Sequence, residues 1–262
     1  MSDAATPNDA AIHLDHVSKV FGKIGTGAAY RAVDVLNLDV RPGQMLALLG
    51  KTGCGKSTIF NMIAGLTEPT SGTVRVSGRD PFAEFDSFRG RMAIVFQNDR
   101  LLPWRSAIQN VELGLEMLEM PAAERRASAQ LWLTKLGLGG HENDYPHALS
   151  GGMRQRVSIA RAFAVEPELL LCDEPFSSLD EMTARDLRAE FVRLVRQNGK
   201  TAVFITHQIR EAMEIGDRVL VFHRPARIAF EARMDRTAGE DARQRVHEKI
   251  LEVLALEAPG GG

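Results

Sequence analysis

The sequence predicts an α/β protein in which a parallel-sheet core is interrupted by a helical insert. Two stretches, near residues 45–66 and again after residue 169, alternate short apolar runs with helical patterns. Between about residues 101 and 166 the pattern is helical throughout. Strands that alternate with helices form parallel sheets, so the first two stretches supply the core and the third supplies the insert.

The N-terminal part of the chain has a different pattern. From residue 12 to about residue 49, apolar and polar residues alternate and few helix signals occur. A period of two is typical of half-buried strands. We therefore expect a β-rich N-terminal subdomain.

Each expected element is bounded by a change of pattern or by a turn signal. The expected strands cover residues 45–49, 74–77, 92–96, 169–172, 201–206 and 218–222. The expected helices cover residues 58–66, 112–120, 122–136, 153–165, 183–197, 209–215 and 241–256. The first helix stops at a run of turn formers, Thr67-Glu-Pro-Thr-Ser-Gly72. The last helix is amphipathic, which favours a packing role.

The length of 262 residues suits one large α/β domain or two small ones. We expect a disordered arm over residues 1–11, a single domain over residues 12–257 and a disordered tail over residues 258–262. Within the domain, the core is expected over about 12–98 and 167–225, the helical insert over about 99–166, and a C-terminal helical tail over about 238–257.

Composition excludes several classes of protein. The formal charge of −2 gives no support to bulk nucleic-acid binding. The apolar runs are far too short to cross a bilayer, and no secretory signal is visible at the N-terminus. The two cysteines, Cys54 and Cys172, favour a reduced cytosolic setting in which both thiols fill space. We expect a soluble protein, and any work at a membrane would have to be done through a partner.

A phosphate-binding loop follows the apolar run at residues 45–49. Residues 50–57, Gly-Lys-Thr-Gly-Cys-Gly-Lys-Ser, fit the pattern G-x-x-x-x-G-K-[ST] between a strand and a helix. The glycines let successive backbone N–H groups point inward at phosphate oxygens. Lys56 is placed to bridge the β- and γ-phosphates of a nucleotide, and Ser57 offers a hydroxyl to Mg²⁺. The alternative is a Gly-rich turn with a solvated lysine. The expected nucleotide contacts are Gly50, Lys51, Thr52, Gly53, Cys54, Gly55, Lys56, Ser57 and Thr58.

A second anion-binding pattern occurs at residues 149–156, Leu-Ser-Gly-Gly-Met-Arg-Gln-Arg. Ser150, Gly151 and Gly152 lead directly into a helix-forming stretch near Met153. This arrangement points backbone N–H groups and a positive helix end at an anion, and Ser150 adds a hydroxyl donor. The alternative is an ordinary Ser-capped helix after a glycine turn.

Polar side chains stand where several apolar strands end. Asp173 and Glu174 follow the strand at residues 169–172, Gln97 follows residues 92–96, and His207 follows residues 201–206. Ligands of open α/β sheets bind at the carboxyl ends of strands, so these residues should converge with Lys56. Asp173 and Glu174 point to opposite faces of an extended strand and can take different roles. The alternative for each is a satisfied or solvated polar side chain.

The complete set, from about Phe21 to Phe222, resembles the ATP-binding subunit of a bacterial ABC importer. The implied fold is that of a P-loop NTPase with a RecA-like core. Residues 149–156 resemble the ABC signature motif. The element Gln97-Asn-Asp-Arg-Leu-Leu-Pro-Trp104 and the run 149–162 are most similar to the nitrate, sulfonate and taurine group. Gln208 and Met153 depart slightly from the family pattern, at positions where Asp and Gln are common.

The resemblance implies a role for each site residue. Ser57 would bind Mg²⁺, and Asp173 would support it through a water. Gln97 would touch Mg²⁺ or the attacking water, and Glu174 would polarise that water. His207 would hydrogen-bond the γ-phosphate. The adenine would stack on Phe21. Tyr30 is the second choice, because residues 22–29 look like a small insertion that could shift the register. Either ring could instead belong to the core. Residues contacting the site of a second copy would be Ser150, Gly151, Gly152 and Asp180.

The resemblance also implies partners. Two copies would close head to tail around ATP, and polytopic membrane permease subunits would contact residues 97–104. This subunit would be cytoplasmic and peripheral, on the cytoplasmic face of the inner membrane. A periplasmic or lipid-anchored solute-binding protein would be an indirect partner, on the other side of that membrane. The cargo would be nitrate, sulfonate, taurine or another small anion. Leu101, Leu102 and Trp104 could instead pack inside the insert.

Two other classes of protein remain as alternatives. A soluble ABC-type ATPase of nucleic-acid repair or translation would carry a long coiled-coil insertion, a zinc module or a second cassette, and the sequence shows none. A P-loop kinase or GTPase offers no account of residues 149–156.

Overall fold

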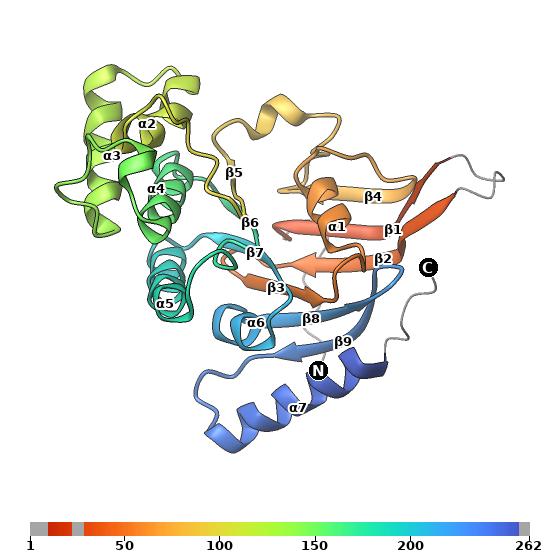
Figure 1. Ribbon diagram of the computed structural model, residues 1–262. Coiled ribbons are helices and arrows are strands. Elements are labelled where there is room, and N and C mark those ends of the chain that lie inside the picture. The colour runs from red at the N-terminus through yellow and green to blue at the C-terminus, as the bar shows by residue number, and fades with distance from the viewer. Residues whose placement is uncertain (1–9, 23–28, 257–262) are drawn as a thin grey trace. The chain divides into compact units, whose positions relative to one another are not determined.

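The computed structural model describes residues 10–22 and 29–256 of the chain (Figure 1). Most of the expected N-terminal arm, the expected tail, and nearly all of the insertion suggested at residues 22–29 lie outside the described residues. The chain forms two compact units, Met1–Asp86 with Thr201–Gly262, and Ser87–Lys200. The domain boundaries drawn from the sequence stay predictions.

An antiparallel sheet opens the first unit. Its strands are β1 (Ile12–Phe21), β2 (Tyr30–Val40) and β4 (Ser71–Val76), in the order β2-β1-β4. Alternate residues of β1 are buried at its start, as the sequence pattern requires. Phe21 lies opposite Tyr30 in the register of β1 and β2. This sheet is the expected β-rich N-terminal subdomain.

The parallel core of the first unit is centred on β3 (Met45–Gly50). It pairs in parallel with β7 (Thr201–Thr206) on one side and β8 (Arg218–His223) on the other. All residues of β3 and β7 are buried. Strands covered on both faces read as continuous apolar runs, which is why these two strands do not alternate. The chain leaves β3 through a short loop and enters α1 (Lys56–Ile63).

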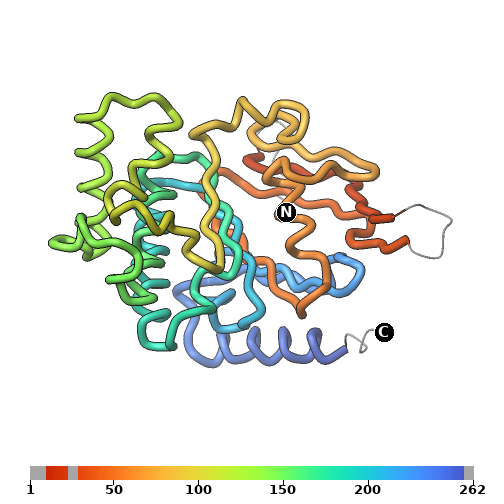
Figure 2. Tube along the Cα trace, turned by 45° about the horizontal axis from the view of Figure 1, so that its top comes forward, coloured from red at the N-terminus to blue at the C-terminus, as the bar shows by residue number. Residues whose placement is uncertain are grey.

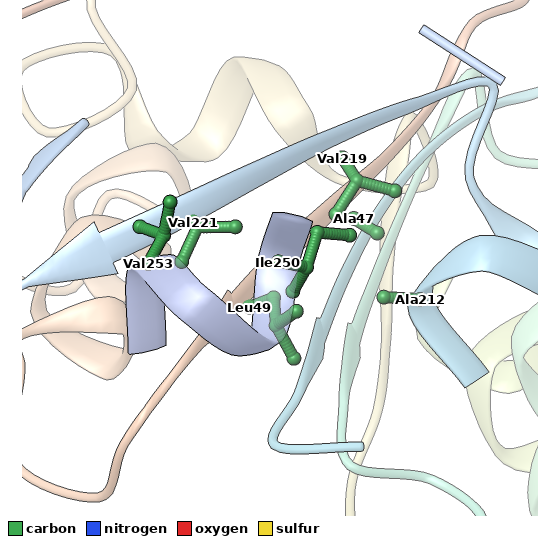
Figure 3. Packing of buried hydrophobic residues seen from close by; sticks show 7 residues of the cluster. All are labelled: Ala47, Leu49, Ala212, Val219, Val221, Ile250 and Val253. Carbon is green, nitrogen blue, oxygen red and sulfur yellow. The ribbon is translucent and has the colours of Figure 1, made fainter. Parts of the chain in front are cut away.

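Two helices cover one face of this core, α6 (Ile209–Ile215) and α7 (Glu240–Leu256). Figure 2 shows α7, in dark blue, running beside the strands that precede it. Burying one aliphatic side chain contributes about 1.5–3 kcal/mol, so α7 is firmly docked. The buried cluster beneath it consists of Ala47, Leu49, Ala212, Val219, Val221, Ile250 and Val253 (Figure 3).

The second unit combines a strand pair with four helices. β5 (Met92–Val95) pairs in parallel with β6 (Leu169–Asp173). The helices are α2 (Ala107–Met117), α3 (Ala122–Lys135), α4 (Gly151–Ala164) and α5 (Glu181–Gln197). A chain of ring contacts crosses this unit, from Trp132 to Phe163 at 5.0 Å, from Phe163 to Phe191 at 5.9 Å, and from Phe191 to Phe176 at 5.9 Å. These contacts join α3, α4, α5 and the loop after β6, and they hold α4 in place.

Several elements differ from the sequence prediction, most of them only in their bounds, and one strand was not expected at all. The helix expected at residues 112–120 is α2, which begins at Ala107 because Ser106 and Gln109 form a capping box. The helix expected from residue 153 is α4, which begins at Gly151 behind the cap of Ser150. The structure also contains β9 (Arg227–Arg233), which pairs antiparallel with β8 and was not expected. Within the described residues, no helix combines the length and apolar character needed to cross a membrane.

Candidate nucleotide-binding site

The phosphate-binding loop has a backbone that requires glycine. Gly53 and Gly55 have φ angles of +82° and +105°, in the region that L side chains rarely adopt. A Cβ added to Gly55 would lie 2.4 Å from the carbonyl oxygen of Ala32. The loop therefore curls tightly against β2 before α1 begins. The first N–H groups of a helix have no acceptor within it, and they can face an anion.

Lys56 is drawn into the loop that precedes it. Its side chain is buried, and its Nζ donates to the carbonyl oxygens of Gly50 at 2.6 Å and Lys51 at 3.0 Å. The sulfur of Cys54 lies 3.7 Å from the same nitrogen. These bonds fix the ammonium beside the curled backbone. A solvated lysine, the alternative from the sequence, is ruled out by this burial.

Of the two candidate adenine-stacking residues, Tyr30 contacts this loop, and Phe21 lies opposite Tyr30 in the sheet. The hydroxyl of Tyr30 donates to the carbonyl oxygen of Gly53 at 3.2 Å, and Arg224 lies over the Tyr30 ring at 4.9 Å. Phe21, opposite Tyr30 in the sheet, leaves 43% of its surface exposed, with Lys19 5.1 Å from its ring centre. Phe21 is therefore not a core residue, and part of its ring is accessible to solvent. Tyr30 is held by the loop itself.

His207 follows β7 at the edge where the loop follows β3. Leu49 pairs with Thr206, so Gly50 and His207 come next on neighbouring parallel strands. The hydroxyl of Thr206 hydrogen-bonds to the buried carboxyl of Glu211 and accepts from the Gln208 N–H at 3.0 Å. This turn fixes the backbone from which the exposed His207 projects. The structure thus brings His207 to the carboxyl-end edge that also carries the phosphate-binding loop.

The second unit brings together the other predicted strand-end residues. Val95 pairs with Cys172, so Gln97 and Asp173 lie just beyond neighbouring strand positions. Glu174 has a φ of +46°, an uncommon conformation for a residue with a side chain. Its carbonyl oxygen accepts from the N–H of Ser177 at 3.2 Å and from its hydroxyl at 3.0 Å. This left-handed residue ends the extended backbone of β6 directly after Asp173, and such outliers gather at functional sites.

The two cysteines fill space beside these motifs. Both are buried thiols, and neither is part of a disulfide. Burial raises the pKa of the Cys172 thiol far above its ordinary value, and the neighbouring carboxylate of Asp173 raises it further. A thiol in this state is neutral and unreactive at physiological pH.

Residues 149–152, which we call the signature turn, lead into α4. Ser150 caps the helix, and its Oγ accepts from the N–H of Met153 at 3.3 Å. The Ser-capped helix expected as the alternative is therefore real, yet the same hydroxyl keeps a proton to donate. Gly152 faces α5, where an added Cβ would lie 2.7 Å from Cγ2 of Thr183. The Asp180 carboxylate caps α5 by accepting from the Thr183 N–H at 3.0 Å.

The segment that carries Gln97 is held by α4, a feature that the sequence analysis missed. Within this Gln97 segment (residues 96–100), the Phe96 carbonyl accepts from Nε2 of Gln155 at 3.2 Å. Arg161 donates to the carbonyl oxygens of Asp99 at 2.8 Å and Arg100 at 2.9 Å. Arg161 is largely buried, which lowers the pKa of its guanidinium, although arginine remains charged in proteins. The sequence carried a signal for this contact, because two arginines, Arg154 and Arg161, are seven residues apart and therefore lie on the same face of a helix.

The start of the helical insert divides into buried and exposed parts. Leu101 is buried, whereas Trp104 exposes 70% of its surface. Asn110, fully buried in α2, donates to the carbonyl oxygens of Leu102, Arg105 and Ser106, and its Oδ1 accepts from the Leu102 N–H at 2.8 Å. The packing expected as the alternative for Leu101, Leu102 and Trp104 therefore holds for Leu101 and not for Trp104, and the contact with a membrane subunit stays a prediction. Leu101 packs inside the insert, and Trp104 is presented on a rigid turn.

The oxygen-bearing residues at these strand ends suit Mg²⁺. Ser57 presents an exposed hydroxyl at the start of α1, Gln97 an exposed amide, and Asp173 a carboxylate. In the described part of the chain, no three His, Cys, Asp or Glu side chains gather as metal ligands. Mg²⁺ commonly binds through one or two protein oxygens together with the phosphates of its substrate, and each of these side chains offers an oxygen of the kind that Mg²⁺ takes.

The fold and the loop together define a P-loop nucleotide-binding protein of the α/β class. A family model described as ABC transporter matches residues 33–177, more than half of the chain. The taurine import ATP-binding protein TauB of Yersinia pestis is 42% identical over 190 residues, covering 72% of this chain and 73% of that protein. The chain belongs to the ABC transporter family, and it is an ATP-binding ATPase of that family.

Other relatives extend the similarity along the chain. An ABC transporter ATP-binding protein of Methanocaldococcus jannaschii is 39% identical over 256 residues, covering 94% of this chain and 92% of that protein. The nitrate import ATP-binding protein NrtC of Synechococcus elongatus is 42% identical over 210 residues, covering 79% of this chain. This chain spans 31% of the length of the nitrate protein. The resemblance to the nitrate, sulfonate and taurine group is confirmed.

Solved structures support the fold class. A dimeric ATP-binding cassette bound to ADP and phosphate in a post-hydrolysis state has a TM-score of 0.74 and 31% identity, covering 86% of this chain and 99% of that one. The structure of cbiO1 of Clostridium perfringens, part of the ABC transporter complex cbiONQ, has a TM-score of 0.78 and 25% identity, with 96% of each chain covered. The predicted P-loop NTPase fold is confirmed. The roles assigned to individual site residues stay predictions.

Proposed function

We propose that this chain hydrolyses ATP as one half of a head-to-tail dimer and thereby drives import of a small anion through separate membrane subunits. The observation that carries the proposal is the pairing of two anion-binding elements in one chain, the phosphate-binding loop and the signature turn. Each ends in a helix N-terminus with backbone N–H groups. A second copy can supply the donors that the first copy's bound ATP lacks.

The phosphate-binding loop holds the nucleotide in this proposal. Backbone N–H groups from Gly53 to Ser57 surround the phosphates, and Lys56 moves its ammonium from the loop carbonyls toward the β- and γ-phosphates. Because Lys56 is already confined near them, little side-chain entropy is lost when it binds. Phe21 stacks on the adenine, since part of its ring is accessible to solvent, whereas the Tyr30 hydroxyl braces the loop. The remaining contacts are Gly50, Lys51, Thr52, Cys54, Gly55 and Thr58.

The strand-end residues act on the γ-phosphate. Mg²⁺, when bound, neutralises charge that develops on the phosphate oxygens, and Ser57, Gln97 and Asp173 are the residues that would hold it. Glu174, the left-handed residue directly after β6, orients the attacking water and accepts its proton. His207 donates to the γ-phosphate and holds the water in place. This assignment rests on family membership and on the two strand-end pairs described above.

Closure completes the site in the dimer. Ser150, Gly151 and Gly152 of one copy donate to the γ-phosphate bound by the other, and Asp180 contacts the facing site. Donors aimed at the transferring phosphoryl group stabilise its transition state, so hydrolysis waits for closure. Bound ATP then favours the closed dimer, and hydrolysis of the ATP lets the dimer open again. The dimeric form of a similar ATP-binding cassette supports this arrangement.

The exposed Trp104 marks the proposed contact with membrane permease subunits, at the edge formed by residues 97–104. A large exposed aromatic side chain on a rigid turn suits a protein interface. The chain would then sit on the cytoplasmic face of the inner membrane, with a solute-binding protein delivering cargo from the other side. Nitrate, taurine or a similar small anion is the proposed cargo, because relatives carry those names.

Replacement of Glu174 by glutamine tests the catalytic assignment. Glu174→Gln should lower ATP hydrolysis about 100-fold or more, because general-base catalysis contributes at least that much. Binding of ATP, followed with a fluorescent analogue, should stay unchanged. Glu168→Gln, which neutralises an acid paired with Arg91 at the other end of β6, is the matched control and should hydrolyse ATP normally. Normal turnover by Glu174→Gln would remove this residue from the mechanism.

A further inference from the structure

The carboxylate of Asp99 joins two parts of the second unit. Its Oδ2 accepts from Nε of Arg154 at 3.0 Å, and its Oδ1 accepts from the N–H of Leu101 at 3.1 Å. Arg154 lies in the first turn of α4, and Leu101 begins the insert. Asp99 therefore connects the helix that starts at the signature turn to the turn that presents Trp104.

Arg154 continues this connection to the signature turn itself. Its Nη1 donates to the carbonyl oxygen of Leu149 at 2.8 Å, directly before Ser150. One guanidinium thus holds a backbone atom of the signature turn and the side chain of the Gln97 segment together. The planar fork of arginine fixes the relative directions of its two acceptors, which a lysine cannot do.

The surrounding contacts make this connection stiff. Gln155 and Arg161 hold the carbonyl oxygens of Phe96, Asp99 and Arg100, so the Gln97 segment is bound to α4 at both ends. The Asp99 and Arg154 side chains are about two-thirds buried, with 28% and 36% of their surfaces exposed. A partly buried, charge-assisted hydrogen bond is shorter and stronger than a neutral one and is screened less by salt.

We propose that Asp99 and Arg154 form a positioning pair that transmits ATP-driven closure at the signature turn to residues 101–104. This inference rests on the proposed function and adds the route by which nucleotide state reaches the membrane-partner edge. The route is a contiguous series of contacts, from Leu149 through Arg154 and Asp99 to Leu101. Neither residue touches the nucleotide in this scheme, so each positions other groups.

Hydrogen–deuterium exchange on the dimer tests the pair without a membrane partner. The parent protein is the Glu174→Gln variant, which binds ATP without hydrolysing it in this proposal. Its exchange is measured once without nucleotide and once with ATP and Mg²⁺. In the parent, ATP should slow exchange at residues 149–155 and also at residues 98–104, by about fivefold or more, as expected for coupled sites. Adding Asp99→Asn keeps an oxygen for the Leu101 N–H but removes the charged partner of Arg154. Protection should persist at residues 149–155 and be lost at residues 98–104.

Two further variants decide the interpretation. Arg154→Lys keeps the positive charge but replaces the two donor nitrogens, Nε and Nη1, by a single ammonium that does not fix the directions of both acceptors. It should therefore also lose protection at residues 98–104. If Asp99→Asn does not fold, the exchange of Arg154→Lys alone tests the role of the pair. Glu168→Gln breaks a comparable Arg–Glu pair in the same unit and should behave as the parent does.

Full protection at residues 98–104 in Asp99→Asn and in Arg154→Lys would overturn the inference. Loss of that protection in Glu168→Gln as well would also overturn it, because the effect would not be specific to the pair. Absence of ATP-dependent protection at residues 149–155 in the parent would contradict the proposed dimer itself, a distinguishable failure.

Discussion

Gly55 shows how one residue combines backbone geometry and close contact. Its φ of +105° excludes a relaxed L side chain, and the Ala32 carbonyl oxygen leaves no room for a Cβ. Gly43 has a similar left-handed backbone, with φ of +73°, but nothing lies within 4 Å of its missing Cβ. Comparing the two glycines therefore separates the energetic cost of a left-handed backbone from the cost of steric overlap around an added Cβ.

Substitution by alanine should distinguish these two glycines. Gly43→Ala should lower the free energy of unfolding by about 1–2 kcal/mol, the cost of a left-handed residue. Gly55→Ala should cost clearly more and should also weaken ATP binding, because β2 and the loop must separate. Urea denaturation and ATP titration of both variants measure these effects. Equal losses of stability in the two variants would mean that the loop does not press on Ala32.

At the scale of elements, α5 depends on the cap supplied by Asp180. Hydrogen bonds from the Thr183 N–H and hydroxyl lower the pKa of the Asp180 carboxyl below its ordinary value. The charged carboxylate also faces the positive end of the helix. A lowered pKa in the folded state means that the charged cap stabilises the fold.

The cap predicts a specific dependence on pH. Its contribution is complete above the ordinary aspartate pKa of about 3.9 and is lost as pH falls through the lower folded-state value. Asp180→Ala should therefore melt at a lower temperature than the wild type at pH 7, and this gap should narrow below about pH 4. Asp180→Asn, which retains a cap without titrating, should melt close to the wild type at pH 7. A gap that stays constant down to pH 3 in thermal unfolding would contradict the assignment.

Much of the fold could be predicted from sequence, because buried parallel strands and helical periodicity leave strong patterns. β7 and α6 have the predicted bounds, residues 201–206 and 209–215. β9 was missed because it lies at the sheet edge, is largely exposed and follows a Pro-containing turn. The start of α2 was misplaced although the capping box of Ser106 and Gln109 is readable in the sequence.

The candidate site was likewise only partly predictable from the sequence. Motif residues such as Lys56 and Asp173 could be found because their chemistry demands fixed residue types next to a strand end. The supporting contacts could not be found so readily, since they join residues far apart in sequence. Gln155 bonds to the carbonyl of residue 96, and a backbone acceptor leaves no trace in residue identity. Arg154 gave a weak signal, and its partner Asp99 was indistinguishable from a solvated acid.

At the scale of the whole molecule, the proposal makes one chain an incomplete enzyme. Each copy carries a phosphate-binding loop that needs donors and a signature turn that offers them. Two copies related head to tail satisfy both at once, and a two-fold arrangement closes without leaving a free end. Nucleotide binding and association are therefore linked, so ATP should raise the apparent affinity between copies.

The molar mass of Glu174→Gln in solution tests this central claim most directly. Size-exclusion chromatography with light scattering should give the monomer mass of 28.8 kDa without nucleotide and with ADP. Saturating ATP and Mg²⁺ should double the mass, whereas the same variant carrying Ser150→Arg should remain monomeric. A monomer mass at saturating ATP, or an equal doubled mass with ADP, would contradict the account.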